Sequence, residues 1–289
     1  MIRLTLASNA LHLEAARRLR CRPELRAIAG GASLLELLLW EPGRMRLTAL
    51  DRRLWPVRLP VAPLSLALLV PLAMLGVVRE LRLAHLRNAG RALRRIAERA
   101  GRLVLLDDGL DQYRQQPRAV DPERFAADTP CWLFSDAPEA RAAWCRRFRC
   151  HELGPLYQRP APLPEAAPGA TGSLILDAPG LERLAERAAS LPQPWRLAAH
   201  PVVAKRSWSA AGPTLDAGRL GSPPEALIPR FPGWIVVGES MTLLAAARLH
   251  RPEARVVISL PETVDAGLQQ LAARLAARDP ALTLLPPGE

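Results

Sequence analysis

The chain has 289 residues, 49% of them hydrophobic and 23% charged, which excludes an intrinsically disordered chain and allows one large domain or two of ordinary size. The formal net charge is +11, and residues 1–106 hold 19 arginines against seven acidic residues, so the basic excess lies in the first part of the chain. Such a region can face acidic lipid, an acidic glycan or nucleic acid, or it can be a solvated arginine-rich surface.

The first half of the sequence alternates short apolar runs with amphipathic stretches. Ser8 and Asn9 can cap a helix that follows the first strand, and Asp136 can cap a later one. In residues 79–100, apolar side chains recur at three- and four-residue steps among arginines, which is typical of an amphipathic helix. We expect strands at residues 1–7, 46–50, 103–106 and 132–135, a short apolar element at 33–40, and helices at 10–20, 79–100 and 138–144.

Residues 59–78 carry no charge and are mostly Leu, Val and Ala. The segment is long enough to span a bilayer, but Pro60, Pro63 and Pro71 interrupt it. We therefore expect a buried element or one that dips into a membrane interface. The basic helix expected at 79–100 would make the pair a membrane-surface anchor; alternatively, the segment packs beneath the first sheet and the arginines are solvated.

Residues 155–172 contain five prolines and almost no charge, so we place a linker at 156–172. After the linker, strand and helix patterns alternate again. We expect strands at 173–176, 195–199, 234–237 and 255–260, and helices at 181–189, 241–249 and 264–278. Alternating strands and helices on both sides of a linker predict two α/β domains with parallel sheets, at residues 1–155 and 173–289.

The four cysteines, Cys21, Cys131, Cys145 and Cys150, form no C-x-x-C pair, and no histidine stands at zinc-finger spacing. The first residues lack the basic and apolar regions of a signal peptide. Scattered thiols without such a leader predict a reducing compartment, and we expect a cytoplasmic protein.

Polar clusters follow three of the expected strands, where parallel sheets bind their ligands: Asp107-Asp108-Gly109, His200-Pro201 and Gly238-Glu239-Ser240. Each alone is also typical of a turn, a structural histidine or a helix cap. Together they suit transfer of a sugar from a nucleotide to an alcohol. A carboxylate takes the proton of the acceptor hydroxyl, a histidine holds or protonates the leaving phosphate, and a helix N-terminus binds that phosphate.

The motifs LVLLDDGLDQY, LAAHP, SPPEALI and WIVVGESMTLLAAA occur in that order over about residues 103–250. In order, spacing and strand context the sequence resembles the bacterial sialyltransferases, a group that includes polysialyltransferases and lipooligosaccharide sialyltransferases. The resemblance implies the GT-B fold, in which two Rossmann-like domains face each other across a cleft. It also implies an inverting transferase that takes CMP-sialic acid as donor and a glycan or glycolipid as acceptor, without a metal or other cofactor.

Carried onto this sequence, the resemblance makes Asp107 or Asp108 the general base and His200 the acid or phosphate ligand, with Pro201 shaping its turn. Nucleotide-binding roles fall to Glu225, for the CMP ribose, and to the last motif, with Gly238, Ser240 and Thr242. The family often has two adjacent hydroxyl residues in this motif, whereas Met241 separates Ser240 from Thr242 here. This departure leaves room for another CMP-linked acid sugar such as Kdo.

Two alternatives remain. One is a GT-B transferase that uses another nucleotide, such as UDP. The other is a non-catalytic basic binding protein, for example for nucleic acid, although the aromatic residues that typically interleave with basic ones in single-strand binders are missing. For the transferase we expect peripheral contact with anionic lipid on the inner face of a bacterial cytoplasmic membrane, and no nucleic-acid partner.

Overall fold

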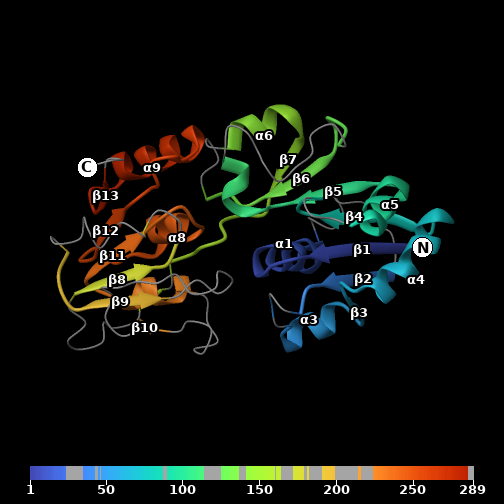
Figure 1. The fold of residues 1–289 in the computed structure, drawn as a ribbon, viewed down its shortest axis with the longest axis horizontal. Coiled ribbons are helices and arrows are strands. Elements are labelled where there is room, and N and C mark those ends of the chain that lie inside the picture. The colour runs from blue at the N-terminus through green and yellow to red at the C-terminus, as the bar shows by residue number, and fades with distance from the viewer. Residues whose placement is uncertain are drawn as a thin grey trace. The chain divides into compact units, whose positions relative to one another are not determined.

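The chain folds into two compact α/β units, shown in Figure 1. Unit 1 comprises residues 1–112 and 116–156, and unit 2 comprises residues 157–289 together with 113–115. The structure is a computed structural model, and it describes residues 1–23, 35–42, 45, 47–86, 90–113, 125–136, 141–159, 161–163, 172–178, 181, 191–198, 214–215 and 224–285. The predicted α/β class with parallel sheets is confirmed for both units.

Unit 1 is built on a seven-stranded parallel sheet with the order β3-β2-β1-β4-β5-β6-β7. Its strands are β1 (Ile2–Ala7), β2 (Leu35–Trp40), β3 (Val57–Pro60), β4 (Val78–Leu83), β5 (Leu103–Leu106), β6 (Pro130–Leu133) and β7 (Arg149–Glu152). All six residues of β1 are buried because helices cover both faces of the sheet. The strand order reverses between β1 and β4, which makes their carboxyl ends the expected ligand crevice.

Two groups of helices cover the sheet of unit 1. One core contains Leu13 and Leu19 of α1 and Trp55, which caps α3; the other contains Leu69 of α4 and Ile96 of α5. The helices are α1 (Ala10–Cys21), α3 (Ala49–Leu54), α4 (Pro63–Met74), α5 (Arg91–Arg99) and α6 (Ala142–Arg147), with the 3-10 helix η1 (Gly109–Tyr113) after β5. Among the described helices, none is long and apolar enough to cross a lipid bilayer.

Unit 2 has a six-stranded parallel sheet with the order β10-β9-β8-β11-β12-β13. Its elements are β8 (Ser173–Leu176), β9 (Trp195–Ala198), β10 (Thr214–Leu215), η5 (Pro224–Arg230), β11 (Trp234–Val237), α8 (Thr242–Leu249), β12 (Arg255–Ile258), α9 (Ala266–Arg278) and β13 (Leu282–Leu284). The order reverses between β8 and β11. Gly172, with φ +105°, enters β8 so close to Pro194 that a Cβ there would lie 2.2 Å from the Pro194 carbonyl oxygen.

The predicted strand at 46–50 is wrong, because this stretch leads into helix α3. Thr48 is the N-cap of α3: its hydroxyl accepts from the Asp51 amide, and the Asp51 carboxylate accepts from the Thr48 amide. This reciprocal pair is a capping box, which satisfies two otherwise unpaired N–H groups. The strand that pairs with β2 follows α3, at Val57–Pro60.

The predicted helix over 79–100 is also wrong in its first part, which forms the central strand β4. Among the residues of this range that the structure describes, only α5, from Arg91 to Arg99, is helical. Arg82, one of the arginines expected on a solvated helix face, is 1% exposed and lies in the sheet beside Glu80, which is 4% exposed. Arg3 of β1 donates to Glu80 at 2.8 Å and to Glu36 of β2 at 2.9 Å, and Arg82 donates to Glu80 at 2.7 Å.

Smaller differences concern α6 and the apolar segment. Helix α6 begins at Ala142, whereas Asp136 accepts a hydrogen bond from the Leu156 amide at 2.8 Å. Residues 137–140, which the predicted helix at 138–144 includes, and 182–190, which hold most of the predicted helix at 181–189, lie outside the described residues. Residues 59–78 form the end of β3, helix α4 and the start of β4.

Candidate functional site

The carboxyl ends of β1, β4 and β5 bring polar residues to the edge of the first sheet where the strand order reverses. Ser8 and Asn9 follow β1 and lead into α1, His85 lies two residues beyond β4, and Asp107 and Asp108 follow β5. His12, in the first turn of α1, completes the group. The expected acidic pair therefore lies at or beside the switch point of unit 1.

The two aspartates of the pair have different surroundings. Asp107 is 1% exposed, and its two oxygens accept from the amides of Gly109 at 2.7 Å and Phe134 at 2.8 Å. Burial raises the pKa of the Asp107 carboxyl to about 7, against the opposing effect of these two hydrogen bonds. Gly109 has φ +80°, a conformation that favours glycine in this turn. Asp107 thus joins the end of β5 to the end of β6.

Asp108 instead faces two histidines. Its Oδ1 lies 2.8 Å from Nε2 of His12 and 3.8 Å from Nε2 of His85. The Asp108 side chain is 8% exposed. The sheet edge therefore presents a carboxylate that is largely buried and held from one side by an imidazole.

The backbone fixes the tautomer of His12. The Ser8 amide N–H donates to His12 Nδ1 at 3.2 Å, so Nδ1 acts as an acceptor and the proton of the neutral ring lies on Nε2. Nε2–H then donates to Asp108. Asn9, the N-cap of α1, accepts from the His12 amide at 3.0 Å, and its Nδ2 lies 3.1 Å from His12 Nε2. The N-terminal turn of α1 thus orients the imidazole toward Asp108.

His12, His85 and Asp108 are also the group of described residues that could hold a metal ion, since their ligand atoms lie within 4.8 Å of one another. A metal on His12 Nε2 would need the lone pair there and a proton on Nδ1. That proton would point at the Ser8 N–H, which already donates to Nδ1. The arrangement therefore fits a hydrogen-bonded carboxylate better than a metal centre.

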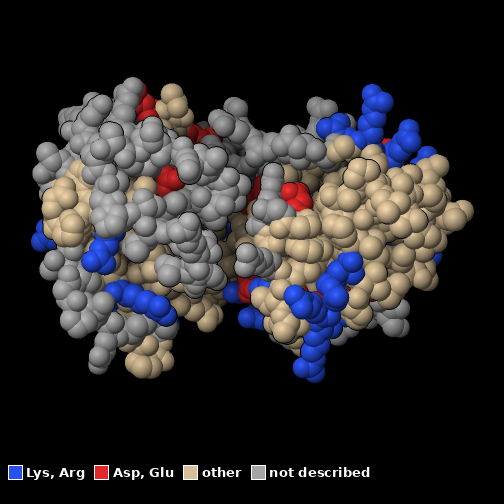
Figure 2. Space-filling model, turned by 60° about the horizontal axis from the view of Figure 1, so that its bottom comes forward, with Lys and Arg blue, Asp and Glu red and all other residues tan. Residues whose placement is uncertain are grey.

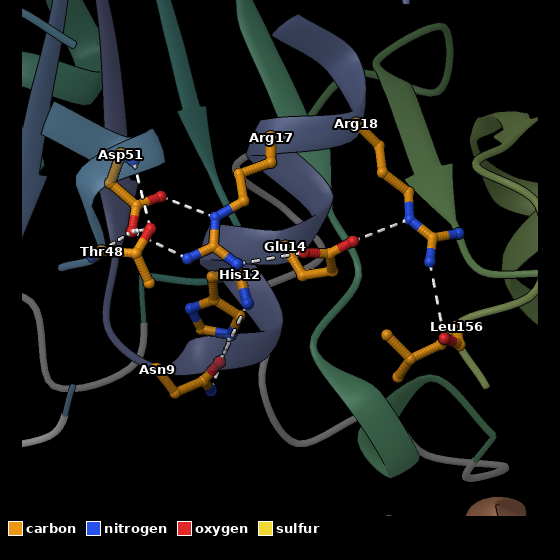
Figure 3. A network of polar contacts seen from close by, with 8 residues as sticks. All are labelled: Asn9, His12, Glu14, Arg17, Arg18, Thr48, Asp51 and Leu156. Carbon is orange, nitrogen blue, oxygen red and sulfur yellow. Dashed lines mark hydrogen bonds and ion pairs between the residues drawn. The ribbon is translucent and has the colours of Figure 1, made fainter. Parts of the chain in front are cut away.

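Helix α1, which carries His12, is held on two sides (Figure 3). Arg17 makes a bidentate pair with Asp51 of α3, with N–O distances of 2.6 and 2.8 Å. Burial would raise the pKa of Asp51, but hydrogen bonds from Arg17 and Thr48 hold it below its ordinary value. Arg18 donates to the carbonyls of Leu153 and Pro155 beyond β7. These contacts fix the helix that places the imidazole.

The carboxyl end of β11 carries the last expected motif, at the switch point of unit 2. Gly238 to Ser240 link the strand to α8, and Ser240 Oγ accepts from the Thr242 amide at 3.2 Å. The hydroxyls of Ser240 and Thr242 also share a short hydrogen bond. The structure thus brings together the two hydroxyls that Met241 separates in sequence, at a helix N-terminus suited to a phosphate.

Glu225 lies in η5, which packs against α8. Burial raises the pKa of the Glu225 carboxyl, and a hydrogen bond with the Tyr157 side chain opposes this shift. His200 and Pro201 lie outside the described residues; β9, which precedes them in the chain, ends at Ala198.

Neither His12 nor His85 belongs to a polar cluster that the sequence patterns indicated. His12 stands three residues after the N-cap Asn9, in a turn that follows a strand. That position could have marked it, because such turns form the ligand edge of a parallel sheet. His85 follows β4. Because residues 79–100 were predicted to be a helix, no strand end was expected beside it.

No family model matches the chain, and no curated protein matches it. No relative therefore supplies a role for these residues.

Proposed function

We propose that this protein is an inverting, metal-independent glycosyltransferase that moves sialic acid, or a related acid sugar, from a CMP donor to a hydroxyl of a glycan or glycolipid. The observation that carries the proposal is Asp108, a largely buried carboxylate held by His12 at the switch point of unit 1. A carboxylate in that position suits a general base.

In the proposed reaction, Asp108 takes the proton of the acceptor hydroxyl as its oxygen attacks the anomeric carbon of the donor. His12 holds Oδ1 of Asp108 and orients the carboxylate, so Oδ2 is the oxygen that receives the proton. The bond between the anomeric carbon and the CMP phosphate breaks as the new glycosidic bond forms. Asp107 is the less suitable candidate, because it is 1% exposed and each of its oxygens already accepts a hydrogen bond from a backbone amide.

The donor is assigned to unit 2. The hydroxyls of Ser240 and Thr242, at the N-terminus of α8, suit the single phosphate of CMP. His200 is proposed to stabilise or protonate the departing phosphate, and Glu225 to bind the ribose hydroxyls. Hydrogen bonds of this kind stabilise the charge that develops on the leaving group without a cation.

The expected GT-B pairing is part of the proposal. Each unit is built on a parallel sheet, with Asp107 and Asp108 at the carboxyl end of β5 in unit 1 and Gly238 and Ser240 at the carboxyl end of β11 in unit 2, as a two-domain nucleotide-sugar transferase requires. Transfer would need the edge with Asp108 to meet the edge with Ser240 in the working enzyme.

The test is incubation of the purified protein with CMP-sialic acid, CMP-Kdo or a UDP-sugar, with glycan acceptors, while CMP or UDP release is measured. We expect CMP release that depends on the acceptor and persists in EDTA. Release of UDP alone would favour the other nucleotide class. Salt-dependent nucleic-acid binding without turnover would favour a binding protein.

The cluster of His12, His85 and Asp108 motivates one further control. A rate that collapses in EDTA and returns with Zn²⁺ or Mn²⁺ would identify the cluster as a metal centre and overturn the proposed metal independence.

A further inference from the structure

Helix α4 presents an apolar face to solvent. Its one buried stripe consists of Ser65, Leu69 and Ala73. On the outer side, Leu64 is 75% exposed and Leu68 is 59% exposed, and at the C-terminal end Met74 and Leu75 are 58% and 77% exposed. No charged residue occurs between 59 and 78. Large apolar side chains that cluster on an exposed helix mark an interaction surface.

Basic side chains border this face. Helix α5 packs against α4 and exposes four arginines, Arg91, Arg94, Arg95 and Arg99, against one acidic residue, Glu98. Arg79, also exposed, follows shortly after the C-terminal end of α4. Figure 2 shows a broad area without charged side chains, bordered by blue side chains, at the end of the molecule where Figure 1 draws α4.

We propose that α4 and α5 together dock unit 1 on an anionic lipid bilayer, with α4 lying in the interface and the arginines of α5 against the headgroups. Helix α4 has 12 residues, a length of about 18 Å, which is too short to cross a bilayer but sufficient to lie along its surface. Each arginine near an anionic leaflet adds attraction that salt weakens.

Charge decides between a bilayer and a second copy of the chain. In a symmetric dimer the same patch would lie on both sides of the interface, so the arginines of α5 on each copy would add positive charge to one contact. An anionic headgroup layer complements that charge, while its acyl region accepts Leu64 and Leu68. The inference does not depend on the proposed transferase activity.

The experiment is cosedimentation of the full chain with vesicles of phosphatidylglycerol and phosphatidylcholine in equal parts, and with vesicles of phosphatidylcholine alone. We expect the wild type to bind the anionic vesicles at least about tenfold more strongly at low salt and to be partly released by high salt. Recovery in the supernatant with both kinds of vesicle would overturn the proposal.

Two double variants test the assigned residues. Leu64→Gln with Leu68→Gln should lower anionic-vesicle binding at least about tenfold, whereas Leu50→Gln, at a 49% exposed leucine of α3, should not. Arg91→Gln with Arg95→Gln should also weaken binding and its salt dependence, whereas Arg230→Gln with Arg274→Gln, which removes the same charge from unit 2, should not.

Circular dichroism and melting temperature establish that each variant folds, as expected for exposed positions. The proposal would be overturned if the Leu64→Gln, Leu68→Gln variant or the Arg91→Gln, Arg95→Gln variant bound anionic vesicles as strongly as the wild type. Sedimentation equilibrium adds a further outcome: a wild-type dimer that becomes monomeric in the Leu64→Gln, Leu68→Gln variant would show that a second copy covers α4.

Discussion

Asp107 and Asp108 are neighbours in the chain, but their carboxylates have different partners. Because Asp108 is the proposed base, Asp108→Asn should lower the rate of transfer about 10²-fold or more and leave the melting temperature nearly unchanged. The rate is measured as acceptor-dependent CMP release. Asp128→Asn, at an exposed aspartate of the same unit, should retain the wild-type rate. A near-normal rate in Asp108→Asn would remove Asp108 from the reaction.

His12 is proposed to position Asp108 rather than to touch substrate. His12→Ala removes a hydrogen bond to a carboxylate and should lower kcat about ten- to hundredfold, with the KM for the CMP donor unchanged, because the donor is assigned to unit 2. His12→Gln keeps an N–H donor and should restore part of kcat. Loss of KM and kcat together, or no recovery with glutamine, would speak against a positioning role.

At the scale of elements, Asp107 links the ends of β5 and β6, and its raised pKa couples this link to pH. Its carboxyl titrates near 7 in the folded chain and ordinarily near 3.8, so the folded state binds this proton more tightly than the unfolded state does. The Asp107 contribution to the free energy of unfolding should therefore be greatest below about pH 4 and fall as pH rises to about 7.

Urea unfolding across that range measures the effect. Asp107→Asn should lose this part of the pH dependence. It should also be less stable by about 1–3 kcal/mol at low pH, because its NH₂ group would face a backbone N–H. Parallel pH profiles for the variant and the wild type would contradict the assignment.

The buried charges of β1, β2 and β4 form a second link between elements. Glu80 accepts from both Arg3 and Arg82, so Glu80→Gln would leave two buried guanidinium groups without their shared carboxylate. We expect a loss of about 3 kcal/mol or more in the free energy of unfolding, measured by urea denaturation. Glu98→Gln, at an exposed position of α5, is the matched control and should change it little. Equal free energies of unfolding for both variants would show that the buried ion pairs of Glu80 are not required for stability.

At the scale of the whole molecule, the proposal divides donor binding and proton transfer between two units. Ser240→Ala with Thr242→Val should weaken CMP binding about tenfold or more, since it removes two hydroxyls from the phosphate site. Asp108→Asn should leave CMP affinity unchanged, as should Thr263→Val at an exposed position of unit 2. Calorimetric titration with CMP measures all of these. Weakened CMP binding in Asp108→Asn alone would place the nucleotide in unit 1.

Local patterns in the sequence predicted the α/β class, the strands β1, β5, β6, β8, β9, β11 and β12 to within a few residues, and the polar clusters at strand ends. Apolar runs that are buried on both faces and end in Gly, Asp or Ser are typical of parallel strands, and this signal lies within a few residues. Asp108 and Ser240 were found in this way, because the residues that follow a parallel strand are at the ligand edge in any such sheet.

Contacts between distant residues decided the rest. Glu80 and Arg82 are compatible with a central strand only because Arg3 and Glu36 lie beside them in the sheet, and nothing near them in sequence reveals those partners. The distinction between Asp107 and Asp108 likewise depends on Phe134, which directly follows β6, and on His12 of α1. A charge can be buried only with a partner, so the tertiary structure determined which charged residues form the core and which form the site.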